Sequence, residues 1–438
     1  MQNYHLSNHA SFIISSNNKK SIMCNQILKT VDLVEPAITK CIKKRKEIPR
    51  YMLDYLIYRG YVYDDAAQES FINNLAQEQF LNSRNPDNTF IIVPTYSCNF
   101  QCKYCFQDDK QKNCKTLLSE QDIERIFDII HTKKDDQKQS ILLFGGEPLQ
   151  SNDVQEKLIY RILSYATKNE ILINIVTNGY DLNKYIDFIK ENKVESLQIT
   201  LDGPSNVHNS RRPVKSGHGS FNKITKNITD TLNHGIPINL RINIDHYNIQ
   251  KLPEIAKFIY DEGWMSSQFF KAYVGFVRNF GNNKYDSGEI EYIVKCFLEL
   301  KRNNQYVSKI NSHGSFPIYF IESLMNNDKL LPPKFQFCSL NNSLLAFCPD
   351  GLIYACVDGV GDSNFIVGSY SEELEIDDEI SNFYSSINVF NTKPCASCHV
   401  KYICGGYCVF NSVRENKHFR EPFCEQTNKV LSLALNFY

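Results

Sequence analysis

Short apolar runs alternate with amphipathic stretches between residues 89 and 280. A short apolar run predicts a buried strand, and apolar residues three or four positions apart predict a helix. Predicted strands cover 90–96, 140–144, 171–177, 196–201, 238–244 and 268–276. Predicted helices cover 119–133, 153–168, 182–192, 219–234 and 249–263, the first of them capped by Ser119 and Asp122. This α/β alternation predicts a parallel sheet in a partial (β/α)6 TIM-like barrel over 89–280, because the two further units of a full barrel are not found in the pattern.

The first 88 residues predict a separate small module. Strand-like runs lie at 12–14 and 61–63, and helical patterns lie between them at 25–32, 34–46 and 48–58. A strand, helices and a closing hairpin predict a winged-helix-like module over 1–88, which binds DNA or captures a peptide along an exposed strand edge. The charged run at 43–46 is short, so a solvated face is the better interpretation and peptide recognition is favoured.

Composition places the chain among globular proteins. Apolar residues make up 42% and charged residues 22% of its 438 positions. The formal net charge of −1 argues against an electrostatic nucleic-acid binder. No run of about eighteen apolar residues is present, and the N-terminus lacks the pattern of a secretion signal, so we expect a cytoplasmic protein without a membrane span. Fifteen cysteines in such a protein indicate metal ligation rather than disulfides.

Three of these cysteines, Cys98, Cys102 and Cys105, directly follow the first strand of the predicted barrel. Thiolates this close together usually bind a soft metal centre. Three protein ligands leave one iron of a four-iron cluster free to bind another molecule. Three ordinary loop cysteines are the alternative, which the motifs on the neighbouring strands weaken.

Glycine-rich or polar motifs follow the next three predicted strands. They are Gly145-Gly146-Glu147-Pro148, Thr177-Asn178-Gly179 and Thr200-Leu201-Asp202-Gly203-Pro204. Each of them alone is compatible with an ordinary turn. Because the carboxyl ends of parallel strands meet at one edge of a sheet, the three motifs and the cysteines are expected to line one mouth.

The Cys-x3-Cys-x2-Cys pattern, with Tyr104 before the third cysteine and Gly-Gly-Glu-Pro on the next strand, resembles the radical S-adenosylmethionine (radical SAM) superfamily. The resemblance implies a [4Fe–4S] cluster on the three cysteines, whose open iron binds the amino and carboxylate groups of S-adenosylmethionine. Cleavage of that cofactor releases a 5′-deoxyadenosyl radical, which abstracts a hydrogen atom from the substrate. The residues implied to contact the cofactor are Tyr104, Phe106, Gly145, Gly146, Glu147, Asn178, Thr200, Arg212 and Asn243.

The same resemblance implies individual roles for these residues. Glu147 is expected to accept a hydrogen bond from the amino group of the methionine, and Arg212, in preference to Arg211, to bind its carboxylate. Ordinary packing inside the barrel is nearly as good an interpretation for the remaining contacts. These are Asn178 and Asn243 at the ribose and Phe106 or Ile242 beside the adenine.

Cysteines become frequent again near the C-terminus, after a polar linker over 281–335 that predicts one helix at 288–302. Seven of them follow the spacing of the SPASM domain, a resemblance that places this domain and a C-terminal helix within 336–438. The resemblance implies two auxiliary [4Fe–4S] clusters, and a zinc module is the alternative. One cluster is implied to use Cys338, Cys356 and Cys408, and the other Cys395, Cys398, Cys404 and Cys424.

Two departures from the family patterns affect the chemistry. No cysteine directly precedes Cys338, so the first auxiliary cluster either keeps an open iron or takes Cys348 as its fourth ligand. Sulfatase-maturing relatives place an aspartate base directly after the second SPASM cysteine, where this chain has Val357. Asp358 follows one residue later and is expected to point to the opposite side if the strand continues. This departure weakens a sulfatase-maturing function.

Together these features favour a radical SAM maturase of a ribosomally made precursor peptide. The leader of that peptide is expected to bind the N-terminal module, and its side chains to be joined through a thioether, carbon–carbon or ether bond. The resemblance also implies an electron donor such as flavodoxin or ferredoxin. An anaerobic sulfatase-maturing enzyme, which oxidises Cys or Ser to formylglycine, is one alternative. A non-catalytic iron–sulfur or zinc scaffold is the other, which the intact Gly-Gly-Glu-Pro motif disfavours.

Overall fold

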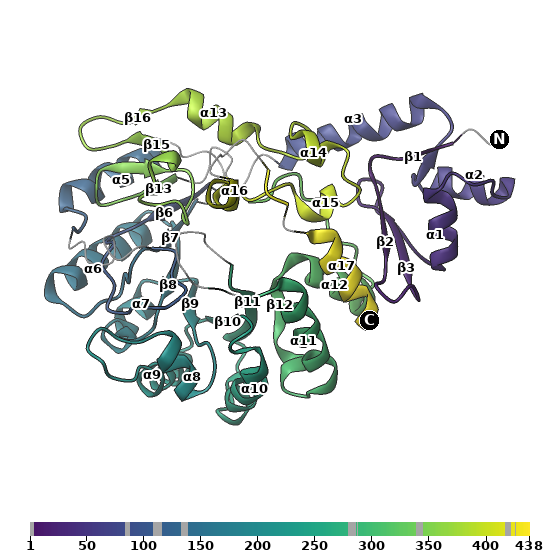
Figure 1. Ribbon diagram of the computed structural model, residues 1–438. Helices are drawn as coiled ribbons and strands as arrows, with labels where there is room; N and C mark the ends of the chain where they lie inside the picture. The colour runs from purple at the N-terminus through teal and green to yellow at the C-terminus, as the bar shows by residue number, and fades with distance from the viewer. Residues whose placement is uncertain are drawn as a thin grey trace.

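The computed structural model describes residues 4–83, 88–107, 116–132, 139–278, 286, 288–338, 345–416, 422–424 and 426–438. Figure 1 shows a broad sheet and its helices at one end of the molecule and a small N-terminal module at the other. The C-terminal helix α17 (Thr427–Phe437), as predicted for this region, lies between these two parts.

Parallel strands form the central part of the main sheet, and they follow one another in the order of the sequence. They are β6 (Asn88–Ile92), β7 (Gln139–Leu143), β8 (Leu172–Thr177), β9 (Ser196–Thr200), β10 (Ile238–Ile244), β11 (Phe270–Phe276) and β12 (Asn311–Gly314). Each neighbouring pair among them is hydrogen-bonded in parallel. Their carboxyl ends therefore lie along one edge of the sheet, where the cysteine triplet and the polar motifs follow them.

Amphipathic helices between the strands complete this part of the core. They are α5 (Glu120–Thr132), α6 (Asp153–Lys168), α7 (Ile186–Glu191), α8 (Ser205–Arg211), α9 (Phe221–Asn233) and α10 (Leu252–Asp261), with 3-10 turns at Leu182–Lys184, Ile249–Lys251 and Trp264–Ser266. In α6 the buried residues Leu158, Ile159 and Ile162 recur at helical spacing and pack in the same core as the strands. The predicted cap of α5 is confirmed, because the backbone N–H of Ser119 donates to Asp122 Oδ2 at 2.8 Å and that of Asp122 to Ser119 Oγ at 3.1 Å.

The sheet continues on the other side of β6 with strands from the C-terminal region. β13 (Leu345–Phe347) pairs in parallel with β6, and β14 (Leu352–Tyr354), β15 (Ile366–Ser369) and β16 (Glu375–Ile376) extend the sheet by antiparallel pairing. In the described residues the result is an eleven-stranded sheet that runs from β12 to β16. The remaining C-terminal elements are a 3-10 turn at Ser363–Phe365 and the helices α13 (Asp378–Ser386), α14 (Lys393–Ala396), α15 (Lys401–Cys404) and α16 (Val409–Asn416). The predicted α/β class with a central parallel sheet is confirmed.

Residues 281–335 contain more structure than the single helix that the sequence predicted. α11 (Ile290–Asn303) corresponds to that helix, but the seventh parallel strand β12, a 3-10 turn at Val307–Lys309 and α12 (Phe316–Asn327) were missed. The sequence of β12 is Asn-Ser-His-Gly, which contains no apolar run that would predict a strand. Backbone hydrogen bonds to β11 hold this segment in the sheet. α12 was missed although its buried Ile318, Ile321 and Leu324 recur at helical spacing.

The N-terminal module is a three-stranded antiparallel sheet with helices. Its strands are β2 (Ala10–Ile14), β3 (Ser21–Asn25) and β4 (Thr30–Val34), its helices are α1 (Pro36–Lys43), α2 (Arg50–Tyr58) and α3 (Ala66–Ser83), and β1 (His5–Leu6) pairs with β5 (Val62–Tyr63). The strand predicted at 12–14 and the helices predicted at 34–46 and 48–58 are confirmed. The residues predicted to close a hairpin, 61–63, instead pair with the first strand of the chain.

Two predictions for this module are wrong. No helix forms at 25–32, because the Asn25 side chain accepts hydrogen bonds from the backbone N–H groups of Ile27 (3.1 Å) and Leu28 (3.2 Å) and turns the chain into β4. The helix α3 was missed because its few buried residues are separated by a largely polar sequence.

The N-terminal module contacts the C-terminal region through α3 and β2. Phe80 of α3 packs with Phe335 and Tyr402 in one apolar cluster. The backbone N–H of Ser16, just after β2, donates to Ser432 O of α17 at 3.0 Å. The domain boundaries at 88, 280 and 335 stay predictions.

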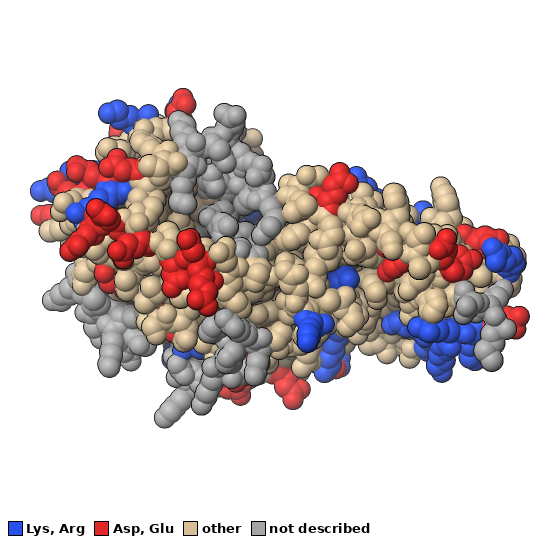
Figure 2. Space-filling view, turned by 90° about the horizontal axis from the view of Figure 1, so that it is seen from above, with Lys and Arg blue, Asp and Glu red and all other residues tan. Residues whose placement is uncertain are grey.

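Charged side chains are unevenly distributed over the surface. Figure 2 shows the largest group of acidic side chains at the end that holds the sheet and the largest group of basic ones at the N-terminal end. The four residues of the basic run at 43–46 are exposed, as expected for a solvated face, although the Lys43 amine also donates to Phe12 O at 3.2 Å. Among the described helices, none is long and apolar enough to cross a membrane.

Candidate functional site: a cavity at the carboxyl ends of the strands

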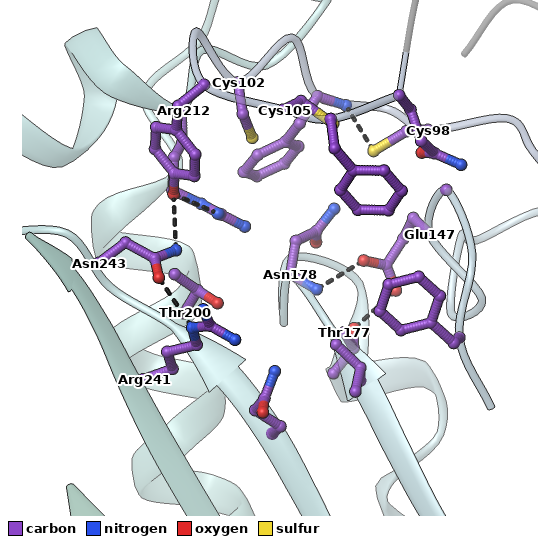
Figure 3. Close-up of a pocket in the computed structure, with 18 of the residues that line it drawn as sticks. Cys98, Cys102, Cys105, Glu147, Thr177, Asn178, Thr200, Arg212, Arg241 and Asn243 are labelled. Atoms are coloured by element: carbon purple, nitrogen blue, oxygen red, sulfur yellow. Dashed lines mark hydrogen bonds between the residues drawn. The ribbon is translucent and has the colours of Figure 1, made fainter. Parts of the chain in front are cut away.

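A cavity of about 400 Å³ opens at the carboxyl ends of the parallel strands. Cys98, Cys102 and Cys105 border it from the loop after β6, opposite the ends of the neighbouring strands (Figure 3). Every residue expected to contact the cofactor lines this cavity: Tyr104, Phe106, Gly145, Gly146, Glu147, Asn178, Thr200, Arg212 and Asn243. Ile242, one of two candidates for the adenine, is instead fully buried and does not line it. The structure thus brings the predicted residues together, while their roles toward the cofactor stay predictions.

Two glycines allow the loop after β7 to pack directly against the cysteine loop. The backbone N–H of Gly146 donates to Thr95 O at 3.1 Å, and that of Glu147 donates to Ser97 O at 2.9 Å. A Cβ atom on Gly146 would lie 2.1 Å from Ser97 O, and one on Gly145, whose φ is +139°, would lie 2.6 Å from Thr95 O. Backbone oxygens cannot swing aside as a flexible side chain does, so both positions require glycine.

The Glu147 carboxylate is buried and held by the chain itself. It accepts hydrogen bonds from Thr177 Oγ1 (2.6 Å) and from the backbone N–H groups of Asn178 (2.5 Å) and Leu149 (2.9 Å). Burial raises the pKa of Glu147 to about 7, although these three hydrogen bonds oppose the rise. The protein therefore occupies three of roughly four acceptor positions on the Glu147 carboxylate. Through these hydrogen bonds Glu147 holds the loops after β7 and β8 together.

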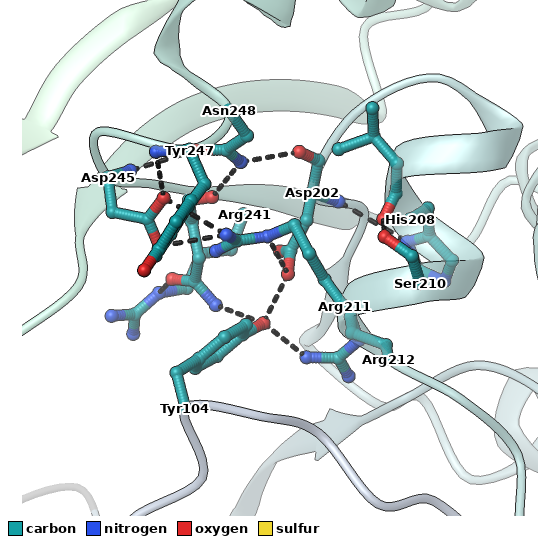
Figure 4. Close-up of polar contacts among 12 residues, drawn as sticks. Tyr104, Asp202, His208, Ser210, Arg211, Arg212, Arg241, Asp245, Tyr247 and Asn248 are labelled. Carbon is teal, nitrogen blue, oxygen red and sulfur yellow. Dashed lines mark hydrogen bonds and ion pairs between the residues drawn. The ribbon is translucent and has the colours of Figure 1, made fainter. Parts of the chain in front are cut away.

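A second polar network ties the cysteine loop to β9 and β10 (Figure 4). The Tyr104 hydroxyl donates to Asp202 Oδ2 at 2.5 Å and accepts from Arg212 Nη1 at 2.8 Å and from Asn243 Nδ2 at 3.1 Å. Asn243 Oδ1 in turn accepts from Arg241 Nε at 2.8 Å. The aromatic residue before the third cysteine therefore anchors the cysteine loop across the cavity.

The two adjacent arginines have different environments. Arg211 forms buried ion pairs with Asp245 (2.8 Å) and Asp202 (3.3 Å) and does not line the cavity. Arg212 does line it, and its buried Nε has no hydrogen-bond partner among the described residues. A buried guanidinium N–H without a partner is costly unless an anion binds it. This observation supports Arg212 over Arg211 as the group that binds a carboxylate.

The residues of the cavity fit the cofactors that the resemblance implies. Three thiols and one guanidinium N–H without a partner face a single space. Burial raises the pKa of the Cys98 thiol well above its ordinary value, so its thiolate form needs a bound metal. Within the described ranges, no three Cys, His, Asp or Glu side chains are grouped around a position for a single metal ion, and a four-iron cluster spaces its ligands farther apart than one ion does.

Several residues that line the cavity were not predicted from the sequence. They are Phe144, Gln198, Arg241 and Arg278, among others. Arg241 lies two positions before Asn243 on β10, so strand alternation was a signal that both share a face. Phe144, directly after β7, stacks on Phe106 of the cysteine loop with ring centroids 6.0 Å apart, and this contact had no signal in the sequence.

Asp358 faces the cavity, which contradicts the expectation that it points to the opposite side. β14 ends at Tyr354, and the chain then turns, with the backbone N–H of Gly359 donating to Cys356 O at 3.1 Å. The alternation of a strand therefore does not extend to this residue. Burial raises the pKa of Asp358, and the neighbouring guanidinium groups of Arg278 and Arg241 oppose that rise.

The cysteines of the first predicted auxiliary set lie close to one another. Burial raises the pKa of the Cys356 thiol, and the nearby Asp358, Cys338 and Cys408 raise it further. Cys348, the other candidate ligand, is fully buried after β13, with its Sγ–H directed at Ala346 O at 3.7 Å. This placement favours a packed structural cysteine at 348.

The second predicted set also gathers, and it borders a larger cavity. Burial raises the pKa of Cys395 to about 12, with further contributions from Cys404, Cys398 and Cys424. The larger cavity, of about 630 Å³, is lined by residues that include Cys404 and Cys424. It shares Phe276, Val277, Arg278 and Gly314 with the first cavity, so the two spaces adjoin. The role of both sets as cluster ligands stays a prediction.

Comparison with known proteins agrees with this geometry. A family model described as the radical SAM superfamily matches residues 92–259. A cysteine-type anaerobic sulfatase-maturating enzyme of Clostridium novyi is 29% identical over 193 residues, which are 41% of this chain and 50% of that enzyme.

Two solved structures share the fold. Native anSMEcpe with bound AdoMet and Kp18Cys peptide has a TM-score of 0.60 and 17% identity, and the match covers 80% of this chain and 97% of that one. Streptococcus suis SuiB bound to its precursor peptide SuiA has a TM-score of 0.55 and 16% identity, and the match covers 96% of this chain and 100% of that one. With the matched family, the cysteine triplet and the cavity in agreement, residues 92–259 form a radical SAM domain, and radical SAM proteins use a [4Fe–4S] cluster and S-adenosylmethionine.

Proposed function

We propose that this chain is a radical SAM maturase that modifies a ribosomally made precursor peptide by joining two of its side chains. The bond formed is a thioether, carbon–carbon or ether crosslink. The proposed cofactors are S-adenosylmethionine and three [4Fe–4S] clusters, one on Cys98, Cys102 and Cys105 and two on the downstream sets. An electron donor such as flavodoxin or ferredoxin is the further proposed partner.

The observation that carries this proposal is the continuity of the two cavities. The space beside the cysteine triplet adjoins a larger one, and Arg278 and Gly314 are among the residues that border both. A volume of about 630 Å³ next to the reaction cavity is large enough for several residues of an extended peptide, since ligand pockets of about 300–1,000 Å³ hold drug-sized molecules. A peptide lying through both spaces would pass the radical site and then the downstream cysteines.

The N-terminal module offers a surface for the peptide's leader. β4 is an edge of the three-stranded sheet, and its Leu33 side chain is 61% exposed. Tyr55 of α2 donates its hydroxyl to Asp32 Oδ1 of β4 at 2.8 Å, so helix and strand lie side by side. An added strand along β4 is the expected mode of binding, because an exposed edge supplies free backbone groups. The exposed tyrosines of α2 beside it are Tyr51, Tyr55 and Tyr58.

The chain's own residues have distinct tasks in this chemistry. When bound, the cluster and S-adenosylmethionine would supply the radical chemistry that removes a hydrogen atom from the peptide. Arg212, with its unpartnered Nε, would bind the carboxylate of the methionine, and Tyr104 holds that guanidinium in place through a 2.8 Å hydrogen bond. Glu147 fixes the loops that border the cavity, and the aromatic pair of Phe106 and Phe144 excludes water from one side.

The decisive experiment is an anaerobic reaction with a candidate precursor peptide, followed by mass spectrometry. A crosslinked product is expected to have lost two hydrogen atoms and to lack an aldehyde. Replacing Cys98, Cys102 and Cys105 by Ala is expected to abolish both this product and 5′-deoxyadenosine, whereas Cys296→Ala, on α11 outside both cavities, is the matched control. Release of 5′-deoxyadenosine without any change in peptide mass, for every precursor tested, would contradict the proposal.

Leader binding has its own test by fluorescence anisotropy of a labelled leader peptide. Leu33→Arg places a charge on the exposed edge of β4 and is expected to weaken binding, while Leu81→Arg, at a comparably exposed leucine of α3, is the control. Equal affinities of both variants and the parent would place the leader elsewhere.

A second candidate, sulfatase maturation, is favoured by one specific observation. Asp358 faces the reaction cavity, so the aspartate of this region is available there despite Val357 in the preceding position. The same mass-spectrometric assay with a Cys- or Ser-containing sulfatase peptide decides between the two candidates. An aldehyde-reactive product would identify sulfatase maturation, and its absence beside a crosslinked precursor would exclude it.

A further inference from the structure

The reaction cavity holds more positive charge than its expected cofactors use. Its described walls carry three guanidinium groups, of Arg212, Arg241 and Arg278, against two carboxylates, of Glu147 and Asp358. Arg212 and Glu147 are the residues expected at the two ends of the methionine. A four-iron cluster on three thiolates is anionic and the sulfonium of the cofactor is cationic, so these two groups largely cancel. Two guanidinium groups and one carboxylate remain for the substrate, and this part of the wall is therefore net positive.

Of the two remaining guanidinium groups, that of Arg278 is directed toward the downstream cysteines. It donates toward Cys408 Sγ at 3.9 Å and lies 5.7 Å from the centre of the Phe337 ring. The Arg278 side chain is exposed and borders both cavities. Arg241 borders the reaction cavity but not the larger one. Of the two, Arg241 is therefore the cation that is specific to the space beside the cysteine triplet.

The Arg241 side chain is held in a fixed orientation on β10. Its Nε donates to Asn243 Oδ1 at 2.8 Å, and the guanidinium lowers the pKa of the neighbouring Tyr273 hydroxyl, against the rise that burial causes. Figure 3 shows the side chain beside Thr200 and Asn243, across the cavity from the cysteines. Asp358 faces the same cavity, but within the described residues no ion pair joins it to Arg241. A half-buried guanidinium in this position is suited to bind an anion from the cavity.

The neighbouring strand leaves room for this guanidinium because position 275 is a glycine. Gly275 of β11 lies opposite Asn243 in the register of the sheet. A Cβ atom on Gly275 would lie 2.8 Å from Arg241 Nε and 3.0 Å from both Arg241 Nη2 and Asn243 Oδ1. All three atoms belong to side chains, so an alanine at this position would displace the guanidinium rather than the strand. The glycine thus allows Arg241 to lie close against β11.

The size of the cavity limits what can reach Arg241. A volume of about 400 Å³ is near the lower end of the range that one drug-sized ligand fills. Beside the cofactor, such a space accommodates little more than one substrate side chain. A side chain that reaches Arg241 is therefore also the one that is presented to the radical.

We propose that Arg241 binds the carboxylate of an acidic side chain of the substrate peptide, and that this acidic residue is the one from which the hydrogen atom is removed. This inference rests on the proposed function, which makes a peptide the substrate. A guanidinium presents its N–H groups in a planar fork that matches the two oxygens of a carboxylate. A neutral amide of the same shape offers a single acceptor oxygen and no charge, so the site discriminates between them.

The test measures hydrogen abstraction from short probes by the full-length protein with reconstituted clusters and S-adenosylmethionine. The probes are N-acetyl-glutamate N-methylamide and N-acetyl-glutamine N-methylamide, deuterated on their amino-acid carbons, with the aspartate and asparagine pair in parallel. Dithionite supplies the electron, and mass spectrometry measures deuterium in 5′-deoxyadenosine. An acid probe is expected to transfer roughly tenfold more deuterium than its amide counterpart, since the amide loses a charge-assisted hydrogen bond.

Two variants test the role of Arg241 by different routes. Arg241→Gln removes the charge, whereas Gly275→Ala keeps every charge and displaces the guanidinium. Both are expected to bring the acid-to-amide ratio close to one, and a ratio taken within one protein cancels any general loss of activity. Arg241→Lys keeps the charge without the fork and is expected to restore part of the ratio. Arg302→Gln, at an exposed position of α11 outside both cavities, is the control.

Equal labelling from acid and amide probes in the parent protein would overturn the inference. A preference for the acid probe that survives in both Arg241→Gln and Gly275→Ala would overturn it too. If no short probe transfers deuterium, the candidate precursor decides. Crosslinking that is unchanged when all Asp and Glu residues of the precursor become amides would overturn the inference and leave the proposed function intact.

The opposite result with the precursor would support the inference. One acid-to-amide substitution would then slow crosslinking about tenfold in the parent protein, and the same substitution would have no further effect in Arg241→Gln. Deuterium transfer that favours the acid probe, without a change of mass in any precursor, would contradict the proposed function and leave Arg241 as a carboxylate site.

Discussion

The contrast between Arg211 and Arg212 gives the sharpest prediction about the barrel. Replacing Arg211 by Met leaves two buried carboxylates without their cation, since Asp245 and Asp202 lie 2.8 Å and 3.3 Å from its guanidinium. Breaking a buried ion pair by removing one partner costs about 3–5 kcal/mol. For a folding unit the size of the matched 92–259 segment, this corresponds to a fall in melting temperature of roughly 6–20 °C.

Replacing Arg212 by Met is expected to have the opposite profile. Its Nε has no partner in the described structure, so the variant loses little beyond the hydrogen bond to Tyr104 and the cation–π contact with Phe100. Loss of a charge-assisted hydrogen bond to the methionine carboxylate, worth about 1.5–3 kcal/mol, is expected to weaken binding of S-adenosylmethionine roughly 10- to 150-fold. Differential scanning fluorimetry under anaerobic conditions measures the first effect, and equilibrium dialysis with radiolabelled cofactor measures the second.

A charge-removal control tests the cause of the instability. In the Arg211→Met background, Asp202→Asn and Asp245→Asn remove the uncompensated charges and are expected to restore part of the lost melting temperature. A stable Arg211→Met variant that fails to bind the cofactor, together with an unstable Arg212→Met variant that binds it, would refute the assignment of the two arginines.

Three further predictions follow from other contacts. Gly146→Ala places a Cβ atom within 2.1 Å of Ser97 O, so the cysteine loop must shift. Iron loading on the triplet should therefore fall while the downstream clusters persist, and an assay of bound iron measures this loss. Because burial raises the pKa of Glu147 from 4.5 to about 7, its contribution to stability is complete below pH 4.5 and declines as the pH rises to 7. Relative to Glu147→Gln, which does not titrate, the wild-type chain should lose roughly 3 kcal/mol across this window, and parallel pH profiles of the two unfolding curves would contradict the burial argument. Phe80→Ala removes the packing of this side chain on Phe335 and should destabilise the attachment of the N-terminal module by about 3–5 kcal/mol. Limited proteolysis measures this effect as faster cleavage within the first 83 residues. Phe71→Ala, at an exposed site of the same helix, is the control.

The amino-acid sequence by itself determined the parallel sheet and the contents of the main cavity. Apolar runs mark β6 to β11, and parallel strands bring their carboxyl ends to one edge, so Cys98, Gly146 and Thr200 had to meet. Within a regular strand or helix, the spacing between residues decides to which side each side chain points. Local patterns were therefore sufficient to predict the sheet and the contents of the cavity. The same reasoning missed β12, which has no apolar run and is held by pairing with β11, and α3, whose three buried residues stand in a largely polar sequence.

Only the tertiary structure decided which neighbouring residue takes which task. Arg211 and Arg212 are adjacent in sequence, but two buried aspartates hold the first and the cavity receives the second. Strand alternation placed Asp358 on the wrong side, because a turn after Tyr354 reverses the direction that alternation assumes. Side-chain pairings of this kind arise where loops from separate strands converge, and their geometry is set by packing across the fold rather than by any spacing along the chain.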